Sequence, residues 1–190
     1  MNKSVLVLID LLNDFFQDQR LSAQRHDLVS SINQLVRSFR QNNQPIIWIR
    51  QEFKPDLSDA FLEMRKHDIR ITIAGTEGAE ILSELEVQPV DTVVVKKRYS
   101  AFFRTELEEV LRTLRPEVLV VAGINTHACV RATVIDAYQR DYQVIVASEC
   151  TASYDEEHHE VTKRYLSDKI ARFLSNSAIH ELLASNNAAS

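Results

Sequence analysis

The chain has 190 residues, of which 45% are hydrophobic and 26% charged, and this suits one globular domain spanning residues 1–190. The net charge of −5, the scattered basic residues and the lack of any apolar run of roughly 18 residues argue against nucleic-acid and membrane partners. With two cysteines and no signal-peptide pattern, a disulfide framework is excluded and the cytoplasm is the expected location.

Short apolar runs rich in β-branched residues alternate along the chain with helical patterns. The runs cover residues 4–10, 45–50, 91–96, 117–123, 142–148 and, more weakly, 170–175. The helical patterns, with apolar residues on one stripe, cover residues 27–43, 77–86, 105–115, 128–141, 155–168 and 177–185. Continuous apolarity in the runs indicates parallel strands that are covered on both faces. This alternation predicts an α/β fold with right-handed crossovers.

The segment of residues 51–78 does not fit this alternation. It is long and mixed in character, and it follows the second predicted strand. We expect it to pass over one edge of the sheet. Such excursions often line substrate sites or build oligomer contacts.

Three polar side chains with complementary chemistry follow predicted strands at their carboxyl ends, the edge where parallel sheets bind ligands. Asp10 ends the first strand, Lys96 ends the third, and Cys129 follows the fourth within "GINTHAC". Singly, they suit a turn residue, a solvated strand end and a small buried hydrophobe. Together they suit nucleophilic catalysis. A helix N-terminus and a nearby lysine would lower the thiol pKa, and a carboxylate can move its proton.

Longer motifs surround these three residues. They read "VLVLIDLLNDFF" (residues 5–16), "KKRYSAFFRTEL" (residues 96–107) and "GINTHACVRATVIDAYQRDYQVIVASECTAS" (residues 123–153). The chain thereby resembles the isochorismatase-like cysteine hydrolases, which include nicotinamidases, N-carbamoylsarcosine amidases, ureidoacrylate and biuret hydrolases, and isochorismatases. The resemblance implies a three-layer α/β/α sandwich with a mostly parallel, six-stranded, doubly wound sheet of order 3-2-1-4-5-6.

The resemblance also implies residue roles. Asp10, Lys96 and Cys129 match the family's catalytic Asp–Lys–Cys triad. Of the two adjacent lysines, Lys96 rather than Lys97 occupies the family position. A cis peptide between Ile124 and Asn125 is implied as well, and it would place the backbone amides of Asn125 and Cys129 as an oxyanion hole.

Further residues are candidates for the walls of a substrate pocket. They are Phe15, Glu52, Arg98, Tyr99 and Thr126. For Thr126 we favour a role in building the turn, and Arg98 equally suits pairing with a carboxylate of the protein. For His127 we favour an orienting or solvent-facing role, and for His158 and His159 a surface or structural one.

The nicotinamidase branch differs from this chain after the second strand. Its members resemble "DWHP" there and bind a metal, whereas "EFKP" in this chain puts Lys54 in the place of the histidine. Because an ammonium is a poor metal ligand, we expect no metal, no cofactor and no nicotinamidase activity.

The function predicted from these residues is hydrolysis of the C–N bond of a small amide, ureido or carbamoyl compound through a thioester. Two alternatives stay open. One is a vinyl-ether hydrolase of the isochorismatase type, in which Cys129 is dispensable. The other is a non-catalytic binding protein on the same fold. The resemblance further implies a small-molecule substrate and a homo-oligomer, either a dimer or a tetramer.

Overall fold

The computed structural model describes residues 3–167 and 169–188, and these residues contain one sheet of six parallel strands in the order β3-β2-β1-β4-β5-β6. The strands are β1 (Ser4–Ile9), β2 (Ile46–Gln51), β3 (Thr92–Lys96), β4 (Val118–Gly123), β5 (Gln143–Thr151) and β6 (Arg172–Leu174). The predicted fold class and strand order are confirmed. Each predicted apolar run overlaps one strand, although β2 and β5 continue past the predicted ends at residues 50 and 148.

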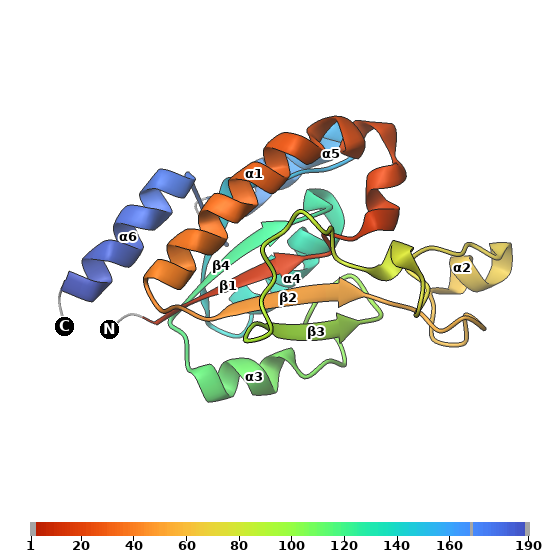
Figure 1. Cartoon of the computed structure of the whole chain (residues 1–190), viewed down its shortest axis with the longest axis horizontal. Helices are drawn as coiled ribbons and strands as arrows, with labels where there is room; N and C mark the ends of the chain where they lie inside the picture. Colours follow the sequence, from red (N-terminus) through yellow and green to blue (C-terminus); the bar gives the residue numbers. More distant parts are fainter. Residues whose placement is uncertain (1–2, 168, 189–190) are drawn as a thin grey trace.

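Helices cover both faces of the sheet, as Figure 1 shows. On one face, α1 (Gln19–Gln41) and α6 (Asn176–Ala188) lie side by side over a core that includes Leu6 and Leu8 of β1. On the other face, α3 (Leu107–Leu114), α4 (Arg131–Tyr138) and the end of α5 (Glu156–Leu166) pack on a core that includes Val5 and Val7. Alternate residues of one strand thus enter two cores, and this explains why its sequence is apolar throughout.

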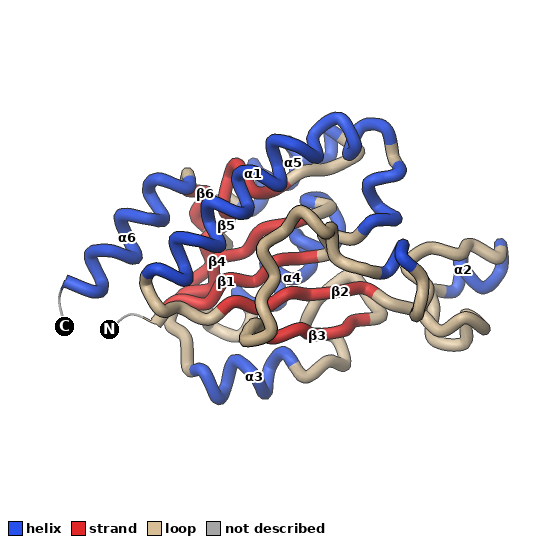
Figure 2. Tube along the Cα trace, viewed as in Figure 1, coloured by secondary structure: helices blue, strands red, loops and turns tan. Residues whose placement is uncertain are grey.

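The predicted helix over residues 77–86 is wrong. The structure has only a short 3₁₀ turn, η2 (Glu77–Ala79), followed by an extended segment that runs antiparallel to residues 11–13. There Leu82 N–H donates to the Leu11 carbonyl at 3.0 Å. Leu82 and Leu85 are both buried in the α1-side core. Their three-residue spacing matches one face of a helix, but the segment forms no helix. Figure 2 shows this loop crossing the sheet.

Two helix starts also differ from the prediction. Helix α1 begins at Gln19 rather than at residue 27, because the Asp18 side chain caps it by accepting from Arg20 N–H at 2.9 Å. The helix predicted from residue 128 starts only at Arg131 as α4, because residues 128–130 belong to a π-turn, η3 (Thr126–Val130). The helix predicted over residues 155–168 corresponds to α5, and its last predicted residue, 168, lies outside the described residues.

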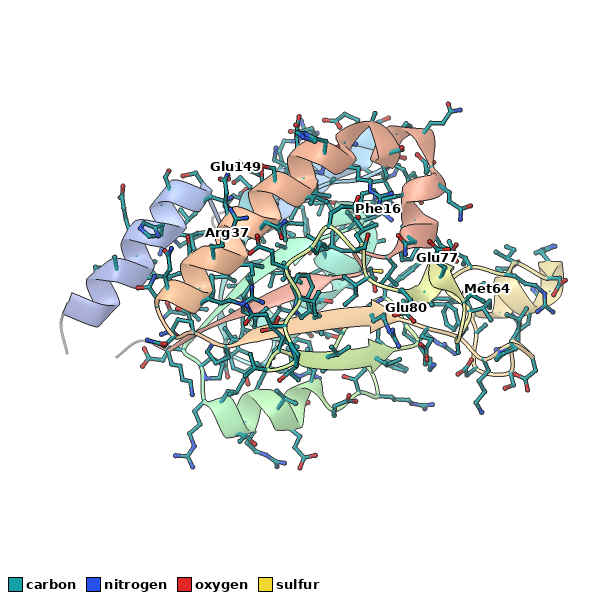
Figure 3. The ribbon with its side chains drawn as sticks, in the orientation of Figure 1. Phe16, Arg37, Met64, Glu77, Glu80 and Glu149 are labelled. Atoms are coloured by element: carbon teal, nitrogen blue, oxygen red, sulfur yellow. The ribbon has the colours of Figure 1, made fainter. Side chains whose placement is uncertain are left out.

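Residues 51–78 project beyond the carboxyl ends of β2 and β3, as seen at the right of Figure 1. They hold the short helix α2 (Leu62–His67) and a small core of their own, made of Phe53, Leu57, Ala60, Met64 and Ile73. Met64 is labelled in Figure 3 on this projecting part. Glu80, also labelled there, lies beside the end of β2, where its carboxylate pairs with Arg50 at 2.9 Å. Among the described residues, no helix combines the length and apolar character needed to cross a bilayer.

Candidate functional site

Asp10 lies directly after β1, where the backbone enters the left-handed region with φ = 54°. This conformation is uncommon for a residue other than glycine, and Asp and Asn tolerate it best. The Asp10 N–H donates to the Ile49 carbonyl at 2.9 Å, and its Oδ1 accepts from Gln51 N–H at 3.0 Å. The end of β2 therefore holds the carboxylate in place, and the side chain is only 1% exposed.

Lys96 ends β3, and because β2 lies between β3 and β1, its side chain must reach across β2 to meet Asp10. Its Nζ lies 2.7 Å from Asp10 Oδ2, 3.4 Å from Cys129 Sγ and 3.0 Å from the Arg98 carbonyl oxygen. The contacts with Cys129 and Arg98 are hydrogen bonds, and the contact with Asp10 is an ion pair. Burial opposes the charge, but the Asp10 carboxylate beside Nζ favours it, and on balance the pKa of Lys96 is raised.

The neighbouring lysine points elsewhere. Lys97 Nζ donates to the Glu52 carbonyl and lies 3.3 Å from Asp59 Oδ2. Successive side chains of a strand alternate between faces, so only one of the two lysines can reach Asp10. In this structure that residue is Lys96.

Cys129 lies in η3, close to where β4 ends at Gly123. Gly123 has φ = 117°, and a Cβ there would lie 2.1 Å from the Ile9 carbonyl oxygen. Only glycine fits this approach of the turn to β1. The next peptide bond, between Ile124 and Asn125, is cis. The turn brings Cys129 beside Lys96 and leaves it 6% exposed.

The electrostatics of the thiol differ from the sequence expectation. Burial raises the pKa of the Cys129 thiol, and the Asp10 carboxylate raises it further, whereas Lys96 lowers it by less. The expected lowering of this pKa is therefore wrong for the resting protein. The thiol holds its proton at neutral pH and lies beside a carboxylate that can accept it.

Side chains of three successive residues bind the turn to the end of β5 and the loop after it. The contacts are Asn125 Oδ1 with Tyr154 N–H (3.3 Å), Thr126 Oγ1 with the Ala152 carbonyl (3.0 Å) and His127 Nδ1 with Ser153 Oγ (2.7 Å). The Asn125 backbone N–H, in contrast, has no acceptor among the described residues. The three side chains thus hold the turn in place, whereas the Asn125 N–H is left without a protein acceptor.

The five pocket candidates lie in different surroundings. Glu52 pairs with Arg50 at 2.7 Å, and Arg98 donates to the Asp59 carbonyl at 2.8 Å and stacks over Phe61. Tyr99 is 54% exposed and also contacts Phe61, and Phe15 packs against the α1-side core. Thr126 is fully buried in the turn. Arg98 contacts the site through its backbone carbonyl rather than its side chain, because this carbonyl accepts a hydrogen bond from Lys96 Nζ.

Gln51 belongs to this site but was missed in the sequence. It is the Cα partner of Lys96 between β2 and β3, is 5% exposed, and has a buried side-chain Nε2 without a hydrogen-bond partner. A buried donor without an acceptor costs free energy and therefore needs an explanation. The rule that drew attention to Asp10 and Lys96, a polar residue ending an apolar strand, applies equally to Gln51.

The residues that replace the metal-binding stretch of nicotinamidases do not fit a metal. The Glu52 carboxylate is neutralised by Arg50, and Lys54 supplies a cation where a neutral histidine would be needed. Among the residues that the structure describes, no group of three or more His, Cys, Asp or Glu side chains is arranged to hold a metal ion.

Comparison with known proteins places this chain in a family. The isochorismatase domain model matches residues 4–178. The chain belongs to the isochorismatase family. Members of this family are hydrolases.

Relatives of the chain agree with this placement. A probable inactive nicotinamidase of Arabidopsis thaliana is 33% identical over 82% of this chain and 84% of its own length. An isochorismatase family protein from Desulfovibrio vulgaris has a TM-score of 0.88 at 27% identity, covering 97% of this chain and 100% of that one. The N-carbamoylsarcosine amidase of Thermoplasma acidophilum has a TM-score of 0.76 at 26% identity, covering 92% and 96%.

Proposed function

We propose that this protein is a cysteine hydrolase that cleaves the C–N bond of a small amide, ureido or carbamoyl compound through a thioester. One observation carries the proposal. A thiol, an ammonium and a carboxylate from three separate elements meet within hydrogen-bonding reach in an almost fully buried place. Buried ionisable groups with perturbed pKa values are typical of catalytic sites.

In the first step the Cys129 sulfur attacks the carbonyl carbon of the substrate. Because the thiol is protonated at rest, Asp10 takes its proton as the S–C bond forms. The electrons of the C=O bond move to oxygen, where the free N–H of Asn125, with that of Cys129, would hold the developing charge. Lys96 keeps the carboxylate in place and stabilises the sulfur as it becomes anionic.

In the second step the C–N bond breaks, and Asp10 returns the proton to the leaving nitrogen. Ammonia or an amine departs and the acyl group stays on Cys129 as a thioester. Water then adds to the thioester with Asp10 as the base, and the thiol is released. The net reaction consumes one water and yields an acid and an amine.

The relatives point to two classes of outcome. The amidase relative supports hydrolysis of a carbamoyl compound. The Arabidopsis relative carries the name of a probable inactive nicotinamidase, and this keeps the non-catalytic alternative open. Lys96 in contact with both Asp10 and Cys129 favours the first class.

An ammonia-release screen over small amides, ureido acids and carbamoyl amino acids tests the proposal. Cys129→Ala should abolish release, whereas Cys150→Ala should retain it. Cys150 is a matched control, because it is also buried but lies in the core under α1 and contacts Asn176. Ammonia release that persists in Cys129→Ala would rule out the thioester route. If the native protein releases no ammonia, a vinyl-ether substrate separates the two alternatives: turnover that survives Cys129→Ala favours the isochorismatase type of chemistry, and no turnover favours the binding protein.

We also propose that the protein works as a dimer or tetramer in the cytoplasm. The family resemblance supports the oligomer, and the two free cysteines suit a reducing compartment. Light scattering at micromolar concentration tests the first point, since a mass of 21.8 kDa would mean a monomer.

A further inference from the structure

His159 of α5 makes a buried contact with the turn that carries Cys129. Its Nδ1 lies 2.9 Å from Thr126 Oγ1, and its side chain is only 12% exposed. Thr126 is fully buried and directly follows Asn125. We propose that His159 is a positioning residue that holds the oxyanion hole in place. This inference rests on the proposed function, since the hole matters only if Cys129 attacks a carbonyl.

The proposal assigns a donor to each hydrogen bond of this cluster. The Thr126 hydroxyl gives its single proton to the Ala152 carbonyl at 3.0 Å, and Thr126 N–H donates to the same oxygen at 3.0 Å. In the proposed arrangement the hydroxyl oxygen accepts from His159, which carries its proton on Nδ1. A chain of donors runs from His159 through Thr126 to Ala152. It connects α5, the turn and the end of β5.

This chain acts on the backbone atoms that the reaction would use. Thr126 stands between Asn125, whose N–H is free, and Cys129, three residues later. Oxyanion donors must be held at fixed positions before the charge develops, because reorganisation during the reaction removes their benefit. The Asn125 and His127 side chains bind the turn to the loop before α5. His159 adds a contact from α5 itself.

His159 does not touch the reacting atoms in this arrangement. Burial lowers its pKa, and Lys163 lowers it further, while Glu156 and Glu160 oppose the effect. It is therefore neutral at pH 7, with Nδ1–H as donor. Its contribution is to geometry, and the experiment must separate geometry from general stability.

Three variants make this separation. In His159→Asn, the amide nitrogen stands near the former Nδ1 and can still donate to Thr126. In His159→Leu no donor remains. His158→Leu is the matched control, because His158 is an exposed neighbour whose Nδ1 pairs with Asp155 at 2.9 Å.

The measurement uses propionaldehyde labelled with ¹³C at its carbonyl, which needs no known substrate. The Cys129 sulfur adds to the carbonyl carbon, the C=O π bond opens, and the thiol proton passes through Asp10 to the oxygen. The resulting hemithioacetal oxygen lies where the oxyanion would form. Titration followed by ¹³C NMR gives its dissociation constant.

We expect His159→Leu to weaken the adduct about fivefold, the effect of one lost hydrogen bond. His159→Asn and His158→Leu should stay within twofold of the native protein. Native binding in His159→Leu would overturn the proposal, and so would equal weakening in His159→Asn and His159→Leu, because that pattern indicates a merely structural role. Absence of an adduct in the native protein would count against the proposed function itself, and the two failures are therefore distinguishable.

Discussion

Replacing Asp10 by Asn tests the buried ion pair on which the site depends. Asn tolerates the left-handed backbone at this position, and its carbonyl oxygen can still accept from Gln51 N–H. The substitution therefore removes little except the charge. Lys96, which is fully buried, would lose its counter-charge at 2.7 Å.

Breaking one partner of a buried pair costs about 3–5 kcal/mol, because the other charge is left without compensation. In a domain of this size, each kcal/mol lowers Tm by about 2–4 °C, so Asp10→Asn should lower it by about 6–20 °C. The double variant Asp10→Asn/Lys96→Met removes both charges. It should recover at least half of the lost free energy of unfolding, while ammonia release stays absent.

Urea unfolding followed by circular dichroism measures these differences. The control is Glu63→Gln, which breaks an exposed pair with Lys66 at 3.0 Å and should cost little. If Asp10→Asn is no more destabilising than this control, Lys96 is not a buried cation held by Asp10. The argument for the site would then be wrong.

Three further predictions concern Gly123, Gln51 and Cys150. Gly123→Ala should destabilise the fold by more than 3 kcal/mol in urea unfolding, because its Cβ would lie 2.1 Å from the Ile9 carbonyl oxygen; a loss below 1 kcal/mol contradicts this close approach. Gln51→Leu should lower kcat/KM at least tenfold without loss of stability, since Nε2 has no partner to lose; unchanged kinetics would exclude Gln51 from substrate binding. Burial raises the pKa of Cys150 from 9.0 to about 12, so its contribution to stability is complete below pH 9 and falls by about 1.4 kcal/mol per pH unit above it. Urea unfolding between pH 8 and 11 should therefore give a shallower pH dependence in Cys150→Ala, and equal slopes would refute the shift.

The strands and the sheet order were predictable because their signals are local or come from the resemblance. β-Branched apolar runs such as "VLVLI" indicate buried parallel strands wherever they occur. The rule that ligands bind at the carboxyl ends of such strands then drew attention to Asp10 and Lys96. The prediction of a helix over residues 77–86 was wrong because the local leucine spacing does not decide the structure there. The segment instead makes backbone hydrogen bonds with the distant residues 11–13.

The sequence by itself determined which chemical groups this protein has and at which strand ends they stand. The tertiary structure alone decided how they meet. It brings Lys96 across β2 to Asp10, neutralises Glu52 with Arg50, and links His159 to Thr126 over 33 residues of chain. It also reversed the expected pKa shift of Cys129, because the burial that outweighs Lys96 is a property of the packed core. Burial and contacts between distant residues depend on the whole fold, and a local pattern cannot contain them.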